Sequence, residues 1–557
     1  MVSNTIITKQ ELIKKFFWPK IGTGIFLLLL SITESCVTVI LSLSIGNYYE
    51  IISDHHSNKG RLLRLFHISI PHNPAKFFMV FAGMVIFKMI IEFTGKYLSE
   101  LQATSFSLTL QKKLFRHHIR MKTKDFTKKP VGKYLLRYSG DINSIRHYLT
   151  KGIFHFISDC IFLIISLAIL FSIDPAITLV VVSALALGFW CMVLINKKLK
   201  KVQVLHRNQL SSNLHFVTER LRLLTTIKLH NKEYSTIKKY QARIDKLMGI
   251  NKRYVFFESM NIALPHAFLY FTLLLIFIVH IYLSSTTGYT VTAGGRFIPY
   301  ILLIILMFPI YKRFLEVNPV WQAGNISFSK IIDTLNLPLE EDEMAQKYSP
   351  SGGVVEFKNV SFTYSGEQPL FDGFNFKYSP GEINQLQGNY KSTILKLILG
   401  IYVADKGIIC LDGININQFT RKSIRENIAF ISEEAPLYGN SIFKCLSITN
   451  TETDRLRAVE MLKLLRFNPF SLKIDLNEKV GENGKLLSKS QYTKMIIARE
   501  LLGNKKIILI DGIFEKIDTV TRQTLTHIIN QSKENHTIIV AGTLPAELNP
   551  HAVYFAS

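Results

Sequence analysis

Six long apolar runs constrain the fold of this chain more than any other feature. Each is about 20 residues long, which is the length a helix needs to cross the hydrocarbon core of a bilayer. The runs occupy residues 21–45, 77–98, 152–171, 176–195, 262–283 and 297–314. A hydrophobic content of 48% in 557 residues agrees with a protein that is partly embedded in a membrane. The sequence therefore predicts a helical membrane domain of six transmembrane helices in residues 1–335.

The basic residues are concentrated between these runs. Most of the net charge of +25 lies in segments 99–151 and 196–256, which join the second run to the third and the fourth to the fifth. Basic connections of this kind lie on the cytoplasmic side, and their apolar residues recur at helical spacing. We therefore expect long cytoplasmic helical extensions, with the lipid bilayer of the plasma (inner) membrane as a partner. Because the membrane accounts for the charge, no nucleic-acid partner is expected.

The composition changes after Leu335. Residues 336–351 contain Pro338, Pro350 and an acidic run, which is typical of a linker. From residue 352 to 557, short apolar segments with strand character alternate with helical segments. This alternation predicts a soluble C-terminal α/β domain.

The sequence QGNYKSTI at residues 387–394 lies between a predicted strand and a predicted helix. A phosphate-binding loop reads G-x-x-x-x-G-K-[ST], but here only two residues separate Gly388 from Lys391, and Tyr390 replaces the second glycine. The loop works by wrapping backbone N–H groups around phosphate oxygens ahead of a helix. A loop that is three residues shorter cannot close in the usual way, and K-S-T alone is a weak signal.

The order of these features resembles the half-transporters of the ABC exporter family. The segments KKLFRHHIRM and FTKKPVGKYLLRYSGDINSIRHYL resemble the family's first intracellular loop, and ERLRLLTTIKLHNKE resembles the second coupling region. In the soluble domain, VSFTY, KVGENGKLLSKSQ with ARELL, and IILID resemble the adenine-contacting segment, the X-loop with the signature helix, and the strand before the magnesium-binding aspartate. The resemblance implies a P-loop-NTPase-like domain.

The resemblance also implies roles for individual residues. Nucleotide-binding positions are Tyr364, Gly388, Lys391, Ser392, Thr393, Glu433 and Asp511. The signature consists of Ser488, Lys489, Ser490 and Gln491, and the contacts between soluble and membrane domains include Pro130, Asp141 and Glu482. ATP and magnesium are the implied cofactors, with Ser392 and Asp511 holding the metal. Whether ATP is bound at all stays open at this point.

The departures from the family pattern concern the groups that do chemistry. Glu433 replaces the glutamine that senses the γ-phosphate, and Lys489 and Ser490 replace two signature glycines. Gly512 stands at the general-base glutamate and Gly542 at the switch histidine. Losing a catalytic base alone costs on the order of 10²- to 10⁴-fold in rate. We therefore expect no catalytic residue in this domain and no useful ATP hydrolysis.

Three functions are compatible with this pattern. The leading hypothesis is the catalytically silent half of a dimeric exporter, which pairs with a second half-transporter and moves an amphiphilic or peptide-like substrate out of the cytoplasm. An alternative is a non-pumping pseudo-transporter that serves as a membrane receptor, sensor or scaffold. An active homodimeric exporter would need hydrolysis without base, switch or complete loop. The sequence determines neither the substrate nor the choice between homo- and heterodimer.

Ionisable residues within the apolar runs are functional candidates, because charge at membrane depth is costly. Glu34 lies in the first run, Lys88 and Glu92 in the second, and Asp159 in the third. Lys88 and Glu92 are four residues apart, so we expect them to pair on one helix face. Glu34 has no partner nearby in the sequence. It could line a path for substrate, pair with another helix or lie near the headgroups.

Overall fold

The computed structural model contains two compact units, which are described separately. The first unit comprises Met1–Phe115 and Gly132–Asn336, and the second comprises Arg116–Val131 and Leu337–Ser557. The structure describes residues 7–52, 74–128, 131–287, 297–340, 346–364, 369–433, 435–446, 451–468, 474–503 and 505–556. The assignment of Arg116–Val131 to the second unit was not predicted from the sequence.

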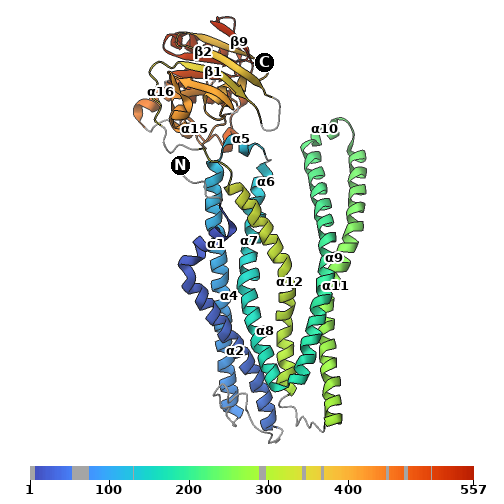
Figure 1. Ribbon diagram of the computed structural model, residues 1–557. Helices are drawn as coiled ribbons and strands as arrows, with labels where there is room; N and C mark the ends of the chain where they lie inside the picture. The colour runs from blue at the N-terminus through green and yellow to red at the C-terminus, as the bar shows by residue number, and fades with distance from the viewer. Residues whose placement is uncertain are drawn as a thin grey trace. The chain divides into compact units, whose positions relative to one another are not determined.

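The first unit is built from long helices (Figure 1). It begins with α1 (Lys9–Phe17) and the short 3₁₀ helix η1 (Trp18–Lys20). Thr8 and Glu11 start α1 with a capping box, in which each side chain accepts a backbone N–H of the other residue. The long helices are α2 (Ile21–Ile52), α4 (Pro74–Ile119), α8 (Phe156–Ile173), α9 (Pro175–Arg222), α11 (Glu233–Thr287) and α12 (Phe297–Leu335).

Shorter elements join these helices. The chain enters α8 through α6 (Val131–Leu136), the π-helix η2 (Arg137–Asp141), α7 (Ile142–Leu149) and the π-helix η3 (Thr150–His155). The third and fourth apolar runs are joined by a tight hairpin, since α8 ends at Ile173 and α9 begins at Pro175. There, the Asp174 side chain accepts the Ile177 N–H, and Pro175 occupies the first turn of α9, where its missing N–H costs no hydrogen bond.

Five helical segments of the described residues are long and apolar enough to cross a membrane: Lys9–Gly46, Pro74–Ile119, Val131–Ile173, Pro175–Arg222 and Glu233–Tyr282. They contain the first four predicted spans and the fifth up to Tyr282. The sixth, 297–314, is helical as the first part of α12 but is not among the five; the preceding residues 288–296 lie outside the described ranges. Apolar side chains such as Val39, Phe162 and Leu303 pack between the helices.

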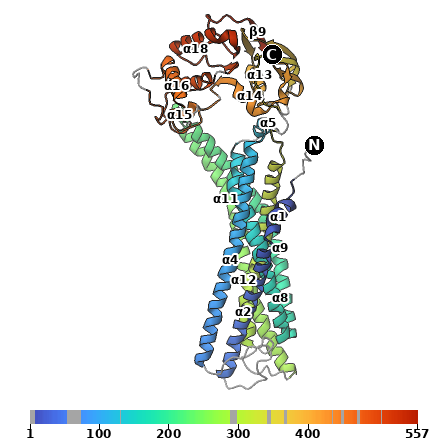
Figure 2. The same ribbon diagram turned by 90° about the vertical axis from the view of Figure 1, so that its left-hand side faces the viewer.

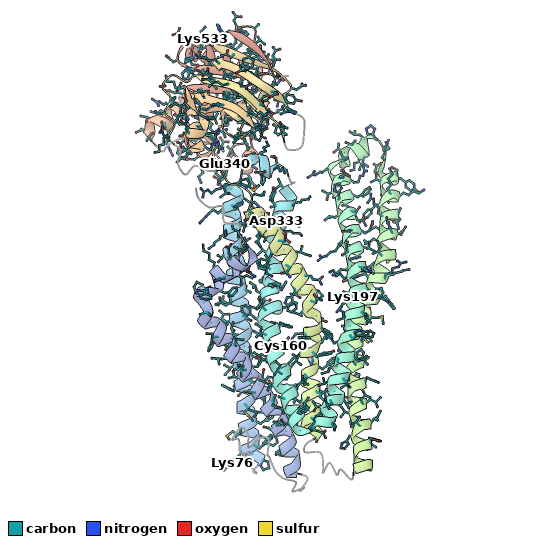
Figure 3. All side chains as sticks on the ribbon, in the orientation of Figure 1. Lys76, Cys160, Lys197, Asp333, Glu340 and Lys533 are labelled. Atoms are coloured by element: carbon teal, nitrogen blue, oxygen red, sulfur yellow. The ribbon has the colours of Figure 1, made fainter. Side chains whose placement is uncertain are left out.

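The hairpin of α9 and α11 extends beyond the rest of the first unit. The two helices lie side by side and are joined at their shared end by α10 (Leu224–Leu229), as Figures 1 and 2 show. Large apolar side chains near this end face solvent; Leu229, for example, is 75% exposed. Figure 3 shows side chains projecting from both sides of the hairpin, with Lys197 marking α9. A large exposed apolar surface marks an interaction site.

The second unit contains two sheets. The antiparallel sheet has the order β2-β1-β4-β5, and the parallel sheet has the order β6-β7-β8-β3-β9. The strands of the first are β1 (Val355–Phe362), β2 (Phe371–Tyr378), β4 (Lys406–Leu411) and β5 (Ile414–Asn415). The strands of the second are β3 (Ile383–Gly388), β6 (Ile428–Ser432), β7 (Ile507–Asp511), β8 (Thr537–Ala541) and β9 (Ala552–Ala556).

Helices complete this unit and bury the sheets. They are α13 (Lys391–Ile398), α14 (Arg421–Asn427), α15 (Ile442–Leu446), α16 (Glu452–Leu464), α17 (Lys489–Leu501) and α18 (Thr519–Ser532). One core cluster surrounds α13 between the sheets, and a second joins the parallel sheet to α16, α17 and α18. The predicted α/β domain is confirmed, although β2, β5, β9, α14 and α15 were not predicted.

Candidate functional site

The connection between β3 and α13 is short. Gly388 still pairs with Ala556 of β9, and α13 begins at Lys391, so that Asn389 and Tyr390 form the whole connection. Gly388 has φ +100°, a conformation that only glycine adopts readily. The Tyr390 ring packs against the core of the domain instead of leaving space before the helix. Few backbone N–H groups are therefore available to surround a phosphate.

The two residues predicted to hold magnesium do meet. The Ser392 hydroxyl, in the first turn of α13, donates a hydrogen bond of 2.8 Å to Oδ1 of Asp511 at the end of β7. A hydroxyl and a carboxylate are oxygen ligands of the kind that Mg²⁺ accepts, but Mg²⁺ sites usually add phosphate oxygens and water. No cluster of three or more His, Cys, Asp or Glu suited to a metal occurs within the described ranges. The donor pair fits magnesium, whereas the shortened connection does not fit a triphosphate in the family's manner.

Tyr364, predicted to contact adenine, is hydrogen-bonded to the start of α13. Its hydroxyl lies 3.0 Å from Oγ1 of Thr393, which is buried. Its ring meets Tyr402 edge-on, at 5.6 Å between ring centroids. Two of the predicted nucleotide-binding side chains are thus bonded to each other.

Glu433 has a partner in its own domain. Its Oε2 lies 2.7 Å from Nζ of Lys516. This hydrogen bond, opposed by a smaller effect of burial, raises the pKa of the Lys516 amine above its usual value. The negative charge that replaces the expected glutamine is therefore neutralised by Lys516, a residue for which the sequence offered no motif.

A carboxylate lies beside Gly542, one of the two glycines that stand at the positions of the catalytic groups. Gly542 has φ +120°, and a Cβ added to it would lie 3.2 Å from Oε1 of Glu515; a Cβ on Gly512, at φ +63°, would meet nothing within 4 Å. Glu515 accepts hydrogen bonds from the N–H and the hydroxyl of Thr543. These bonds, helped by the charges of Lys391 and Lys516, hold the pKa of the Glu515 carboxyl below its usual value.

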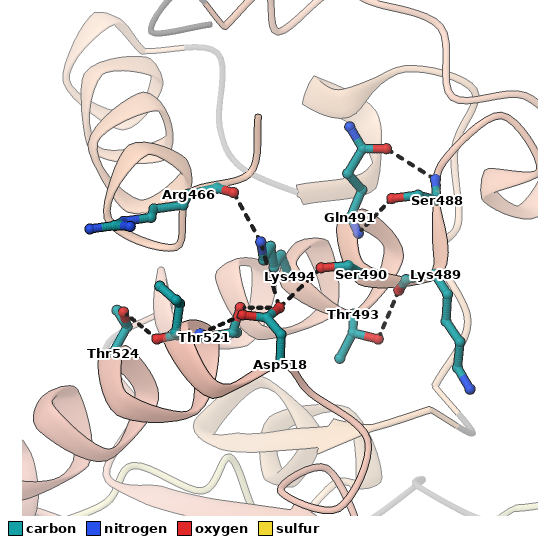
Figure 4. Close-up of polar contacts among 11 residues, drawn as sticks. Arg466, Ser488, Lys489, Ser490, Gln491, Thr493, Lys494, Asp518, Thr521 and Thr524 are labelled. Atoms are coloured by element: carbon teal, nitrogen blue, oxygen red, sulfur yellow. Dashed lines mark hydrogen bonds and ion pairs between the residues drawn. The ribbon is translucent and has the colours of Figure 1, made fainter. Parts of the chain in front are cut away.

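The signature residues form the start of α17 (Figure 4). Ser488 is the N-cap, and its hydroxyl and the Gln491 side chain each accept the other residue's backbone N–H. Ser490 donates a hydrogen bond of 3.2 Å to Asp518. Figure 4 shows the exposed Lys489 pointing away from this cluster.

Asp518 ties the signature to the next helix. It caps α18 by accepting the N–H and the hydroxyl of Thr521, and Lys494 lies 3.8 Å away. Burial alone would raise the pKa of the Asp518 carboxyl, but the hydrogen bonds from Thr521 and Ser490 and the charge of Lys494 together lower it. The capping geometry of the signature survives, while side chains occupy the positions of its glycines.

Of the predicted coupling residues, Asp141 belongs to the first unit and Glu482 to the second. Pro130 lies outside the described residues. Asp141 is buried within the first unit, where it accepts from Arg137 at 2.6 Å and from Ser327 at 2.8 Å. Glu482 is exposed at the start of the short 3₁₀ helix η5 (Glu482–Gly484). A coupling role for these residues stays a prediction.

A different part of the first intracellular loop packs on the soluble domain within the second unit. It contains the short helix α5 (Thr123–Phe126). Lys124 pairs with Asp405 at 3.1 Å and lies 5.0 Å above the Phe362 ring, and Asp405 also accepts the Thr363 N–H. Phe362 and Thr363 directly precede Tyr364, so this contact reaches the predicted adenine side of the site.

Comparison with known proteins identifies the family. The family described as ABC transporter transmembrane region matches residues 25–310, just over half of the chain, and the family described as ABC transporter matches residues 371–514. The chain belongs to the ABC transporter family. This ABC half-transporter is a multi-pass inner-membrane protein with a helical membrane domain and a cytoplasmic C-terminal nucleotide-binding domain.

Relatives agree with this assignment. The ATP-dependent lipid A-core flippases of Escherichia coli strain K12 and Salmonella typhimurium strain LT2 are each 23% identical to the chain over 469 residues, covering 83% of this chain and 80% of theirs. The structure of a bacterial Atm1-family ABC exporter with ATP bound superposes with a TM-score of 0.74 at 17% identity, covering 94% and 92% of the two chains. The fold is therefore that of an ABC exporter.

Proposed function

We propose that this chain is the catalytically silent half of a dimeric ABC exporter that moves an amphiphilic or peptide-like substrate out of the cytoplasm. The observation that carries the proposal is that side chains expected around nucleotide are already bonded within the domain, either to one another or, for Glu433, to a lysine outside the predicted set. The pairs are Ser392 with Asp511, Tyr364 with Thr393, and Glu433 with Lys516. A nucleotide would have to displace these contacts and would find a phosphate loop of two residues.

Glu515 does not replace the missing base. A general base works best when its pKa lies near the operating pH. The pKa of Glu515 is instead lowered by its bonds from Thr543. Gly512 and Gly542 supply no side chain to orient a water. Phosphoryl transfer depends on positioning and charge stabilisation, and this half retains little of either.

The exposed hairpin supports the need for a partner. The end of the α9–α11 hairpin leaves apolar side chains such as Leu214, Leu221 and Ile237 facing solvent. A second half-transporter would cover such a surface, and the family works as dimers. The exposed Lys489 would then offer a positive charge to nucleotide held by the partner, at a position where the family uses a glycine amide. The names of the flippase relatives support an amphiphilic substrate.

The alternative, a receptor, sensor or scaffold that does not pump, is favoured by the side chains in the signature. Ser490 is bonded to Asp518, which ties down the surface that a partner's nucleotide would approach. The two functions differ in whether pairing with this chain raises the rate of ATP hydrolysis by a partner half-transporter.

Co-expression tests the choice. A half-transporter with an intact loop, signature and glutamate, chosen from the same genome, is co-expressed with this chain and purified through a tag on this chain alone. The silent-half proposal expects a stable pair whose ATP hydrolysis depends on the partner's loop lysine and is unchanged by Lys391→Ala here. A pair that hydrolyses ATP no faster than the partner alone, or no pair at all, would favour the scaffold.

A further inference from the structure

The first unit contains a cavity of about 790 Å³ that the nucleotide chemistry does not use. It lies among α1, α2, α4, α8 and the part of α12 that carries Arg313. Most of its lining is apolar, including Ile21, Ile25, Leu28, Phe154 and Ile157. Pockets that bind small molecules typically measure about 300–1,000 Å³ and combine apolar walls with a few polar groups. The volume therefore suits an organic molecule, and the polar groups decide which kind.

Two of the acidic residues in the lining are already paired. Asp159 accepts both Nε and Nη2 of Arg313, at 3.1 and 2.6 Å. Glu92 pairs with Lys96, so the expected pairing with Lys88 is wrong. A glutamate four residues before a lysine is the favourable order on a helix, and the order Lys88–Glu92 is the reverse.

Glu34 is the third acidic side chain in the lining of the cavity. It lines the cavity on α2 and is half-buried, and its carboxylate makes no hydrogen bond or ion pair to any residue that the structure describes. His155 lines the same cavity, and its Nε2 is also without a hydrogen-bond partner in the described part of the chain. An unpaired carboxylate among apolar walls is costly unless a counter-charge reaches it.

Besides Lys96, which pairs with Glu92, two lysines line the cavity, and both lie at another level along the helices. Lys14 and Lys20 belong to α1 and η1, and fourteen residues separate Lys20 from Glu34, about 21 Å along a helix at 1.5 Å per residue. Each lysine lies over an aromatic ring, Lys14 over Trp18 at 5.3 Å and Lys20 over Phe16 at 4.3 Å. Basic and aromatic residues of this kind are typical of the membrane interface. They do not neutralise the deeper carboxylate.

We propose that this cavity binds an apolar organic cation and that Glu34 supplies the counter-charge. The apolar walls of the cavity receive the body of the ligand. Among the described residues that line the cavity, Asp159 and Glu92 are held in ion pairs, and Glu34 is the carboxylate without one, while Lys88, Lys96 and Arg313 act on it only at longer range. Binding requires neither nucleotide nor a partner; only the export of the bound cation rests on the proposed function.

The experiment compares two ions of the same shape and opposite charge. The full chain in nanodiscs of phosphatidylcholine, without nucleotide, is titrated calorimetrically with tetraphenylphosphonium and with tetraphenylborate, and empty nanodiscs provide the baseline. We expect saturable binding of the cation, at least about tenfold weaker in Glu34→Gln, because a charge-assisted contact is lost. Glu34→Asp should recover part of the affinity.

Glu316→Gln is the matched control, since Glu316 is exposed on α12 and does not line the cavity. It should bind the cation like the unmodified chain. Equal cation affinity in Glu34→Gln and the unmodified chain, tighter binding of tetraphenylborate, or no saturable cation binding would each overturn the proposal. These outcomes are separate from the proposed function, which is tested by ATP hydrolysis and can fail or hold with either result here.

Discussion

Restoring the missing carboxylate at Gly512 tests whether the absent base is the only defect of the nucleotide site. A Cβ at this position meets nothing within 4 Å, so the first side-chain atom enters open space. The backbone there has φ +63°, and placing an L-residue in this left-handed region costs about 1 kcal/mol. Gly512→Glu should therefore fold, with a small loss of thermal stability that Gly512→Ala shares.

The expected result is that Gly512→Glu hydrolyses ATP no faster than Gly512→Ala. If the base were the only missing group, its return would raise the rate on the order of 10²- to 10⁴-fold. We expect no such gain, because Asn389 and Tyr390 alone join β3 to α13 and phosphate is not positioned. Phosphate release by the purified full chain in nanodiscs is the assay. A rise of about 100-fold or more over Gly512→Ala would refute the reasoning.

Two further changes test the contacts that surround the sites. Arg313→Met should lower the free energy of unfolding by about 2–3 kcal/mol, because the substitution leaves the buried Asp159 carboxylate without its partner. The loss should be smaller than for a fully buried pair, because Arg313 is half exposed. Thermal melting should show most of this loss recovered in the double variant Asp159→Asn/Arg313→Met, and a double variant no more stable than Arg313→Met would argue against the ion pair. Asp518→Asn should destabilise the chain at pH 7 by about 1 kcal/mol. Because the folded-state pKa of Asp518 is lowered, the contribution of its carboxylate to stability is complete above the ordinary aspartate pKa of about 3.9 and is lost as the pH falls through the lower folded pKa. The melting temperatures of the unmodified chain and of Asp518→Asn should therefore converge below about pH 4. A difference between them that stays constant there would contradict this assignment.

The parts of the fold that local pattern dictates could be predicted from the sequence. Apolar runs of about 20 residues predict membrane helices because the bilayer thickness sets their length. The proximity of Ser392 and Asp511 was expected because the resemblance places both in the metal site, and the hydrogen bond between them agrees with that. The capped start of α17 at Ser488 follows the same logic, since a serine ahead of a helix with glutamine at the third position is a local signal.

Contacts between distant segments could not be predicted in this way. Arg313 and Asp159 are 154 residues apart, and nothing in their own surroundings in the sequence couples them. Glu515 belongs to no recognisable sequence motif. Its position beside Gly542 depends on how the chain turns after β7. The contact of Lys124 with Asp405 likewise requires the first intracellular loop to pack on the soluble domain. Packing, which depends on the whole chain, decides each of these.

ATP hydrolysis by the purified chain alone is the most direct test of a catalytically silent half. Phosphate release is measured in nanodiscs with ATP and magnesium, for the unmodified chain and for Lys391→Ala, which removes the lysine of the shortened loop. The two rates should be equal and should not exceed that of nanodiscs without protein. A measurable rate that Lys391→Ala abolishes would mean that this domain hydrolyses ATP, and the account would be wrong.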